Sequence, residues 1–168
     1  MSHEIDYHDR AIGDLYVAKL LTSPKGNPSN DEGVLDIAAY HVQQGIEKEL
    51  KHIMHDICGV PDDTRVFRTH VIDDLIDQVE TQTSFVVPDD VKEIALNLTN
   101  WEAQSRYPNS IASTLDEITT AIEIFEDLLD KTYDWIAEEY PDNIDNESST
   151  DETETDATED SDWEDPIE

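Results

Sequence analysis

The run AAYHVQQGIEKELKHIMHDICG, residues 38–59, decides the fold of this 168-residue chain. Its apolar residues recur every three or four positions, the spacing that places them on one face of an α-helix. Asn30 and Asp31 offer helix-capping side chains before the run, and Gly59 and Pro61 end it. The stretch therefore predicts one long amphipathic helix of about seven turns.

The apolar side of this helix is expected to face the core. It comprises Val34, Ile37, Ala38, Val42, Ile46, Leu50, Ile53, Met54 and Ile57. Small residues at Ala38, Ala39 and Gly45 would let a neighbouring helix come close. The polar residues are interpreted as an ordinary solvent-facing side with one i to i+4 ion pair, Glu47 with Lys51. They are Gln43, Gln44, Glu47, Lys48 and Lys51.

Helical spacing also predicts four further helices, over residues 4–21, 70–81, 88–101 and 114–140. Thr114 and Glu117 have the spacing of a capping box at the start of the last one. The residues expected to face inward are Ile5, Ala11, Ile12, Leu15 and Leu20, then Val71, Leu75 and Val79, then Val91, Ile94, Ala95, Leu98 and Trp101, then Ile118, Ala121, Ile122, Phe125, Leu128, Leu129, Trp135 and Ile136. The fold class is therefore all-α, a five-helix up-and-down bundle in residues 1–140.

Residues 141–168 contain 13 acidic and no basic residues, with many Ser and Thr. Such a segment buries too little apolar surface to offset its chain entropy, so it is predicted to be a disordered acidic tail. It is interpreted either as a solubilising tail or as a nucleic-acid mimic that covers a basic site.

The whole chain has 42 acidic and 10 basic residues and a formal net charge of −32. This charge repels phosphate backbones, which argues against indiscriminate DNA or RNA binding unless the few cations gather in one place. No apolar run approaches the roughly 20 residues of a membrane span, and the polar N-terminus is unlike a signal peptide. We expect a cytoplasmic protein without membrane contact.

Metal and cofactor chemistry is not indicated by the sequence. His52, His55 and Cys58 lie three residues apart, but three-residue steps drift around a helix, so the three cannot reach one ion without help. The sequence has neither a phosphate-binding glycine loop nor a Ser-His-Asp pattern in context. We therefore expect no metal and no cofactor.

Four landmarks in order resemble the HEPN (higher eukaryote and prokaryote nucleotide-binding) domains, especially their short prokaryotic members. These landmarks are Ala11, the run Gln43 to Lys51, His70 with Asp74 and Leu75, and Arg106-Tyr107-Pro108. The resemblance covers residues 5–140. It implies a helical bundle, often a homodimer, that frequently works with a separately encoded nucleotidyltransferase in a toxin-antitoxin-like pair.

Catalytic HEPN members are metal-independent ribonucleases that use an Arg and a His, with about four to six residues between them, near the start of the last helix. A His can act as general acid or base on a ribose hydroxyl, and an Arg can stabilise the phosphate charge. Here YPNSIASTLDE follows Arg106, and no His occurs after His70. The pair Arg65 and His70, with four residues between them, is the alternative catalytic pair. Otherwise His70 is expected to cap or orient the turn into the next helix.

The resemblance and the scarcity of cations together suggest a binding site for phosphate or a partner. Its candidate residues are Arg106, Tyr107, Lys48, Lys51, Gln44, Glu47 and His70. The first hypothesis is a non-catalytic nucleotide-binding or protein-interaction module with a nucleotidyltransferase partner and a possible nucleotide or RNA ligand. The alternatives are a ribonuclease toxin that uses the Arg65 and His70 pair, and a salt-adapted form of either.

Overall fold

The computed structural model describes residues 6–61, 65–104 and 113–141. It contains five α-helices: α1 (Tyr7–Thr22), α2 (Glu32–His52), α3 (Ile72–Gln82), α4 (Asp89–Gln104) and α5 (Leu115–Glu139). A π-helical turn, η1 (Ile53–Ile57), extends α2, and a 3-10 turn, η2 (Arg65–Arg68), precedes α3. No strand occurs in these three ranges. The all-α bundle is confirmed, whereas the predicted acidic tail lies outside the described residues except for Pro141.

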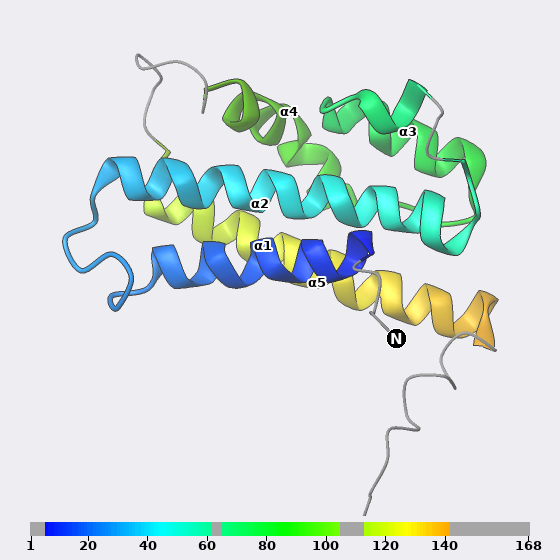
Figure 1. The fold of residues 1–168 in the computed structure, drawn as a ribbon, viewed down its shortest axis with the longest axis horizontal. Coiled ribbons are helices and arrows are strands. Elements are labelled where there is room, and N and C mark those ends of the chain that lie inside the picture. Colours follow the sequence, from blue (N-terminus) through cyan, green and yellow to red (C-terminus); the bar gives the residue numbers. More distant parts are fainter. Residues whose placement is uncertain (1–5, 62–64, 105–112, 142–168) are drawn as a thin grey trace, which may run out of the picture.

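The helix α2 runs through the middle of the bundle (Figure 1) and contacts the other four. The helix α1 lies antiparallel along it, α5 packs beneath this pair, and α3 and α4 cover the opposite side (Figure 1). The shared core draws fully buried side chains from α2, α3, α4 and α5, among them Ile46, Leu75, Leu98 and Phe125. This arrangement surrounds most of α2 with protein.

The inward faces of three helices differ in part from the sequence expectation. Ile12 and Leu20 on α1 are 42% and 39% exposed, because the buried stripe of that helix runs through Ala11, Leu15 and Ala18 instead. Ile37 on α2 is exposed, while Leu35 is buried. Val71 precedes α3 and is exposed, and Ile72 and Ile76 pack in its place.

The start of α5 is fixed by a capping box. Thr114 and Glu117 form the predicted capping box, in which the Thr114 hydroxyl accepts a hydrogen bond from the Glu117 N–H. The Glu117 carboxylate in turn accepts one from the Thr114 N–H at 2.9 Å. This backbone bond and a second bond from the Thr114 hydroxyl hold the pKa of Glu117 below its usual value.

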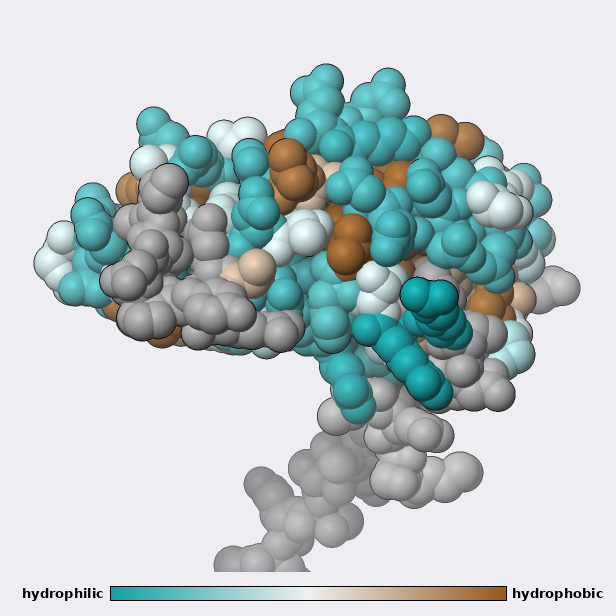
Figure 2. Space-filling model, turned by 90° about the horizontal axis from the view of Figure 1, so that it is seen from above, coloured by the Kyte–Doolittle hydropathy of each residue, from teal (hydrophilic) through white to brown (hydrophobic). Residues whose placement is uncertain are grey.

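The face that α3 and α4 present to solvent is mainly hydrophilic, with apolar groups scattered among polar ones (Figure 2). None of the helices in the described ranges is long and apolar enough to cross a membrane.

Candidate functional site: a buried polar network beside an arginine pocket

The polar side of α2 is buried. Gln43, Glu47 and Lys51 are 0%, 4% and 4% exposed. The Glu47 carboxylate accepts hydrogen bonds from Gln43 Nε2 at 2.9 Å and from Lys51 Nζ at 2.7 Å. The interpretation of these residues as a solvent-facing side was wrong, because segments distant in sequence cover them.

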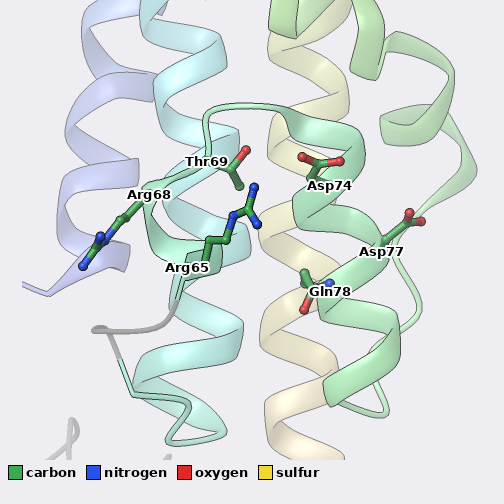
Figure 3. Close-up of a pocket in the computed structure, with 6 residues that line it drawn as sticks. All are labelled: Arg65, Arg68, Thr69, Asp74, Asp77 and Gln78. Atoms are coloured by element: carbon green, nitrogen blue, oxygen red, sulfur yellow. The ribbon is translucent and has the colours of Figure 1, made fainter.

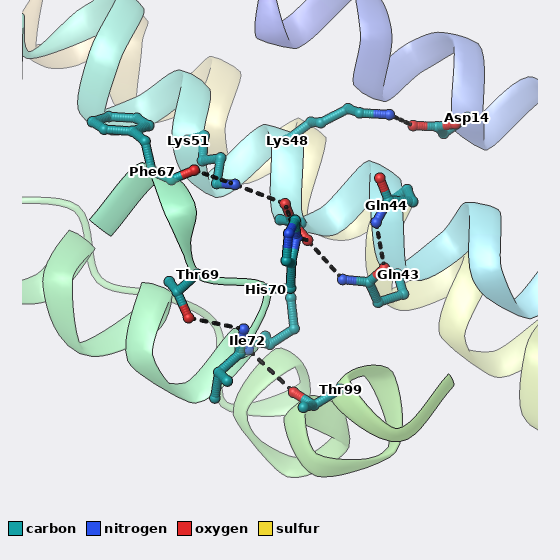
Figure 4. Close-up of polar contacts among 12 residues, drawn as sticks. Asp14, Gln43, Gln44, Lys48, Lys51, Phe67, Thr69, His70, Ile72 and Thr99 are labelled. Carbon is teal, nitrogen blue, oxygen red and sulfur yellow. Dashed lines mark hydrogen bonds and ion pairs between the residues drawn. The ribbon is translucent and has the colours of Figure 1, made fainter. Parts of the chain in front are cut away.

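The covering segment is the stretch from η2 to the start of α3. His70 Nδ1 lies 3.1 Å from both carboxylate oxygens of Glu47 (Figure 4). Lys51 Nζ also donates to the carbonyl oxygen of Phe67 at 3.2 Å. We call Gln43, Glu47, Lys51 and His70 the Glu47 network. It compensates one buried negative charge with one buried positive charge and fixes η2 on α2.

The sequence predicted that His70 would either cap α3 or orient the turn before it, and His70 does not cap α3. The N–H of Ile72 donates to Thr99 Oγ1 of α4, and the N–H of Val71 donates to Thr69 Oγ1, both at 3.1 Å (Figure 4). His70 instead orients the turn through its contact with Glu47. Its side chain is 51% exposed, and with Nδ1 facing Glu47 the other ring nitrogen, Nε2, is left for other partners.

Lys48 and Gln44 lie at different edges of the network. Lys48 pairs with Asp14 of α1, which also lies 2.8 Å from His41 Nδ1. Gln44 Nε2 donates to Gln43 Oε1 at 2.8 Å, at the edge of the Glu47 network. Among the predicted binding residues, the structure thus brings Glu47, Lys51 and His70 together, while Lys48 fastens α1 to α2.

The predicted residues Arg106 and Tyr107 lie outside the described part of the chain. Their assignment as phosphate or partner contacts therefore stays a prediction.

A pocket opens beside the Glu47 network, between η2 and α3. Its volume is about 490 Å³, and its lining residues are Arg65, Arg68, Thr69, Asp74, Asp77 and Gln78. The guanidinium of Arg65 points into the space between η2 and α3, whereas Arg68 extends toward α1 (Figure 3). We call this the Arg65 pocket.

The two arginines of the pocket differ from Lys48 and Lys51 in whether they form ion pairs. None of the ion pairs formed within the described residues involves Arg65 or Arg68, whereas Lys48 and Lys51 are both paired with carboxylates. A guanidinium offers five N–H donors in a planar fork that suits phosphate oxygens. Two arginines that form no ion pair within the described residues therefore lie together at η2.

Sequence reasoning considered Arg65 only as a catalytic partner and gave no role to Arg68, Asp77 or Gln78. The signal that could have found the pocket is the run RVFR, residues 65–68, because it holds two of the four arginines in the chain. Asp77 and Gln78 carry no comparable signal, since acidic and amide residues are common on exposed helix faces.

These features define a helical bundle with a charged network in its central helix and a cationic turn beside it. The family model of the HEPN domain matches residues 27–139, and the chain belongs to the HEPN domain family. The matched region contains the Glu47 network and the Arg65 pocket but leaves out α1. No curated protein and no solved structure matches the chain.

Proposed function

We propose that this protein is a non-catalytic HEPN module that binds a nucleotide in the Arg65 pocket and works with a nucleotidyltransferase. The observation that carries the proposal is the presence of two arginines, unpaired among the described residues, around a pocket of about 490 Å³ in a chain of net charge −32. That volume falls within the range of about 300–1,000 Å³ that is usual for small-molecule sites.

The lining of the pocket offers complementary groups for the parts of a nucleotide. Arg65, which points into the space between η2 and α3, suits phosphate oxygens through charge-assisted hydrogen bonds, and Arg68 adds positive charge at the rim of the pocket. Asp74 and Asp77 accept hydrogen bonds from ribose hydroxyls or base amino groups, and Gln78 can both donate and accept. The two carboxylates also disfavour inorganic phosphate as the ligand, because its negative charge would be repelled by them and it has no hydroxyl or amino group of a nucleoside to donate hydrogen bonds to them.

The position of His70 supports a non-catalytic role. His70 is not among the residues that line the Arg65 pocket, and its ring is held by a carboxylate that also serves Lys51 and Gln43. A general base must reach the proton it removes at hydrogen-bond distance, or through one water molecule. A ligand held in the pocket therefore has no imidazole among its lining groups.

One observation favours a metal-independent ribonuclease as the second candidate function. Glu47 at His70 Nδ1 orients the ring and leaves Nε2 for proton transfer, and Arg65 lies on the adjoining turn. A carboxylate that orients a histidine in this way is common in catalytic sites. A substrate that extends beyond the pocket could place its ribose at His70.

The nucleotidyltransferase partner, the toxin-antitoxin-like pairing and a homodimer rest on the resemblance to short prokaryotic HEPN proteins. Co-expression with a nucleotidyltransferase encoded beside this chain, followed by affinity purification and light scattering, tests the pairing and the dimer together. A nucleotidyltransferase that does not co-purify, or a monomeric chain, contradicts the respective part.

Calorimetric titration with ATP, ADP and AMP tests the binding proposal directly. Wild-type protein should bind at least one of them, and Arg65→Ala should weaken binding about 10- to 100-fold, which corresponds to a charge-assisted hydrogen bond. The matched control is Arg10→Ala, which removes an exposed arginine of α1 outside the pocket. Equal losses for both variants would mean that only the net charge matters, and no binding by wild type would refute the proposal.

An RNA-cleavage assay separates the two candidate functions. A non-catalytic module leaves the RNA intact with wild type, Arg65→Ala, Arg106→Ala and His70→Gln alike. Cleavage by wild type that is lost in His70→Gln and Arg65→Ala would establish the ribonuclease instead, and loss in Arg106→Ala alone would place the site on the predicted Arg-Tyr-Pro segment.

A further inference from the structure

A second cluster of polar side chains lies where the start of α1 meets the end of α2, on a different set of residues from the Arg65 pocket. Ligand atoms of His8, Glu49 and His52 all lie within 4.8 Å of one another. Glu49 is completely buried, and His52 is 8% exposed. His8 comes from α1, so the cluster joins two helices that run antiparallel (Figure 1).

The carboxylate of Glu49 is incompletely compensated. Its Oε2 lies 2.9 Å from His8 Nδ1, but its Oε1 is buried and has no hydrogen-bond partner. Burying a carboxylate is costly unless a cation and hydrogen bonds replace its hydration. The contact with His8 engages only Oε2, so Oε1 lacks a partner whatever the protonation state of His8, and an ion bound through both carboxylate oxygens would remove this deficit.

The orientation of His52 also suits a metal ligand. Its Nδ1 lies 2.8 Å from Asp56 Oδ2, so Nε2 is the nitrogen that remains for coordination. A carboxylate behind a coordinating histidine is the usual arrangement in metal sites, because it fixes the ring and raises its basicity. Asp56 lies in the π-helical turn η1, where the N–H of Cys58 bonds to the carbonyl of Ile53, five residues back. Such turns are frequent at functional sites.

We propose that His8, Glu49 and His52 bind a divalent transition-metal ion, for which zinc has the best-matched chemistry. Two imidazole nitrogens and one carboxylate oxygen form a recognised zinc ligand set that leaves a fourth position open for water or an added ligand. Magnesium and calcium prefer ligands that are all oxygen, so the two histidines select against them.

The distances require only small movements. His8 Nδ1 and Glu49 Oε2 lie 2.9 Å apart, so an ion about 2.0–2.1 Å from both atoms would make an angle of about 90° with them. Opening the pair by about 0.4 Å brings the angle to the tetrahedral value at those bond lengths. The ion would thereby clamp the start of α1 onto α2.

His55 and Cys58, which lie three and six positions after His52 in the sequence, have partners outside the cluster. His55 Nδ1 lies 2.6 Å from Asp56 Oδ1, and Cys58 Sγ lies 3.7 Å from the hydroxyl of Tyr140. The second helix needed for a ligand set is α1, which contributes His8 from 44 positions earlier in the chain. Spacing within α2 alone could not show this.

Titration of the full chain with zinc, and with cobalt as a spectroscopic probe, tests the site. An excess of magnesium in the buffer occupies weak all-oxygen sites on this acidic surface. One tight site per chain should remain, with the visible absorption of tetrahedral cobalt. His8→Ala and Glu49→Gln should each weaken binding at least about tenfold, the lower limit seen for outer-shell partners of metal sites.

His41→Gln is the matched control, because His41 also pairs with a carboxylate but lies outside the cluster. It should bind zinc like wild type. The proposal is overturned if wild type has no saturable site in excess magnesium, or if His8→Ala keeps wild-type affinity. His8 is 41% exposed, so its replacement decides the matter even if a variant at the fully buried Glu49 does not fold.

Discussion

Gly45 allows α2 to pack closely against two other helices, and replacing it with alanine tests the packing of the whole bundle. A Cβ on Gly45 would lie 2.3 Å from Cε1 and 2.6 Å from Cζ of Phe125, and 3.4 Å from the carbonyl oxygen of Ala11. Phe125 is fully buried on α5, so its ring cannot move aside into solvent. The added methyl group must push α5 away from α2 or force the ring off its preferred rotamer.

The expected magnitude combines two opposing effects. Overpacking a core usually costs about 1–3 kcal/mol, and contacts this short belong at the upper end of that range. Alanine in a helix interior is favoured over glycine by about 1 kcal/mol. Gly45→Ala should therefore lower the free energy of unfolding by about 2 kcal/mol, which corresponds to a fall in Tm of roughly 4–8 °C for a chain of this size.

Gly13→Ala on α1 is the matched control. Gly13 also lies inside a helix, but a Cβ there would meet no atom within 4 Å. The same chemical change should thus raise the stability by up to about 1 kcal/mol.

Urea unfolding followed by circular dichroism measures both variants. If Gly45→Ala is as stable as wild type, the close approach of α2 and α5 is wrong. Adding Phe125→Leu to Gly45→Ala should recover part of the loss, because it removes the ring atoms that clash.

Three further predictions concern charge. Glu47→Ala leaves Lys51 buried without its carboxylate and should lower the free energy of unfolding in urea by about 3–5 kcal/mol. Glu126→Ala, the control, removes an exposed ion pair and should lower it by at most about 1 kcal/mol. Equal losses in the two variants would contradict the burial of the Glu47 network. The hydrogen bonds from Thr114 lower the pKa of Glu117. The contribution of the ionised Glu117 to the free energy of unfolding is therefore complete above the ordinary pKa of 4.5 and is lost as the pH falls through the lowered pKa. Glu117→Gln should therefore lower the urea midpoint near neutral pH and equal wild type below that lowered pKa, and a difference that persists in acid would refute this origin. Raising the salt concentration from about 0.1 M to 1 M shortens the electrostatic screening length from about 10 Å to 3 Å. Because repulsion among like charges opposes folding at a net charge of −32, the urea midpoint should rise. A midpoint that falls with added salt would contradict this prediction.

The helices could be predicted from the sequence because their signals are local. The capping pair Thr114 and Glu117 and the apolar spacing of α2 act within a few residues, so they predict helix ends and the main core face. The errors at Ile12 and Leu20 arise because several stripes on α1 are apolar, and only contact with α2 and α5 decides which one is buried.

Glu47, Lys51 and His70 could be named as candidates from the sequence, but their burial could not be predicted, because burial of a charge depends on partners elsewhere in the chain. Glu47 is buried by His70 and Glu49 by His8, and neither partner is within helical reach. A polar residue on an amphipathic helix is usually solvated, so the sequence favoured that interpretation. The three-dimensional contact of η2 and α1 with α2 reverses it.

The arginines of the Arg65 pocket form no ion pair with the residues that the structure describes, and this has a consequence for the kinetics of the proposed nucleotide binding. An anionic ligand that approaches this chain is repelled by the net charge before it comes near enough to contact Arg65. Added salt weakens that distant repulsion more than the short contacts inside the pocket, so the association rate should rise with ionic strength. Most phosphate-binding proteins show the opposite dependence, because their surfaces attract the ligand from afar. For the proposed nucleotide ligand, the negative charge of the whole chain would therefore limit the association rate, whereas the positive charge of Arg65 would favour the bound state.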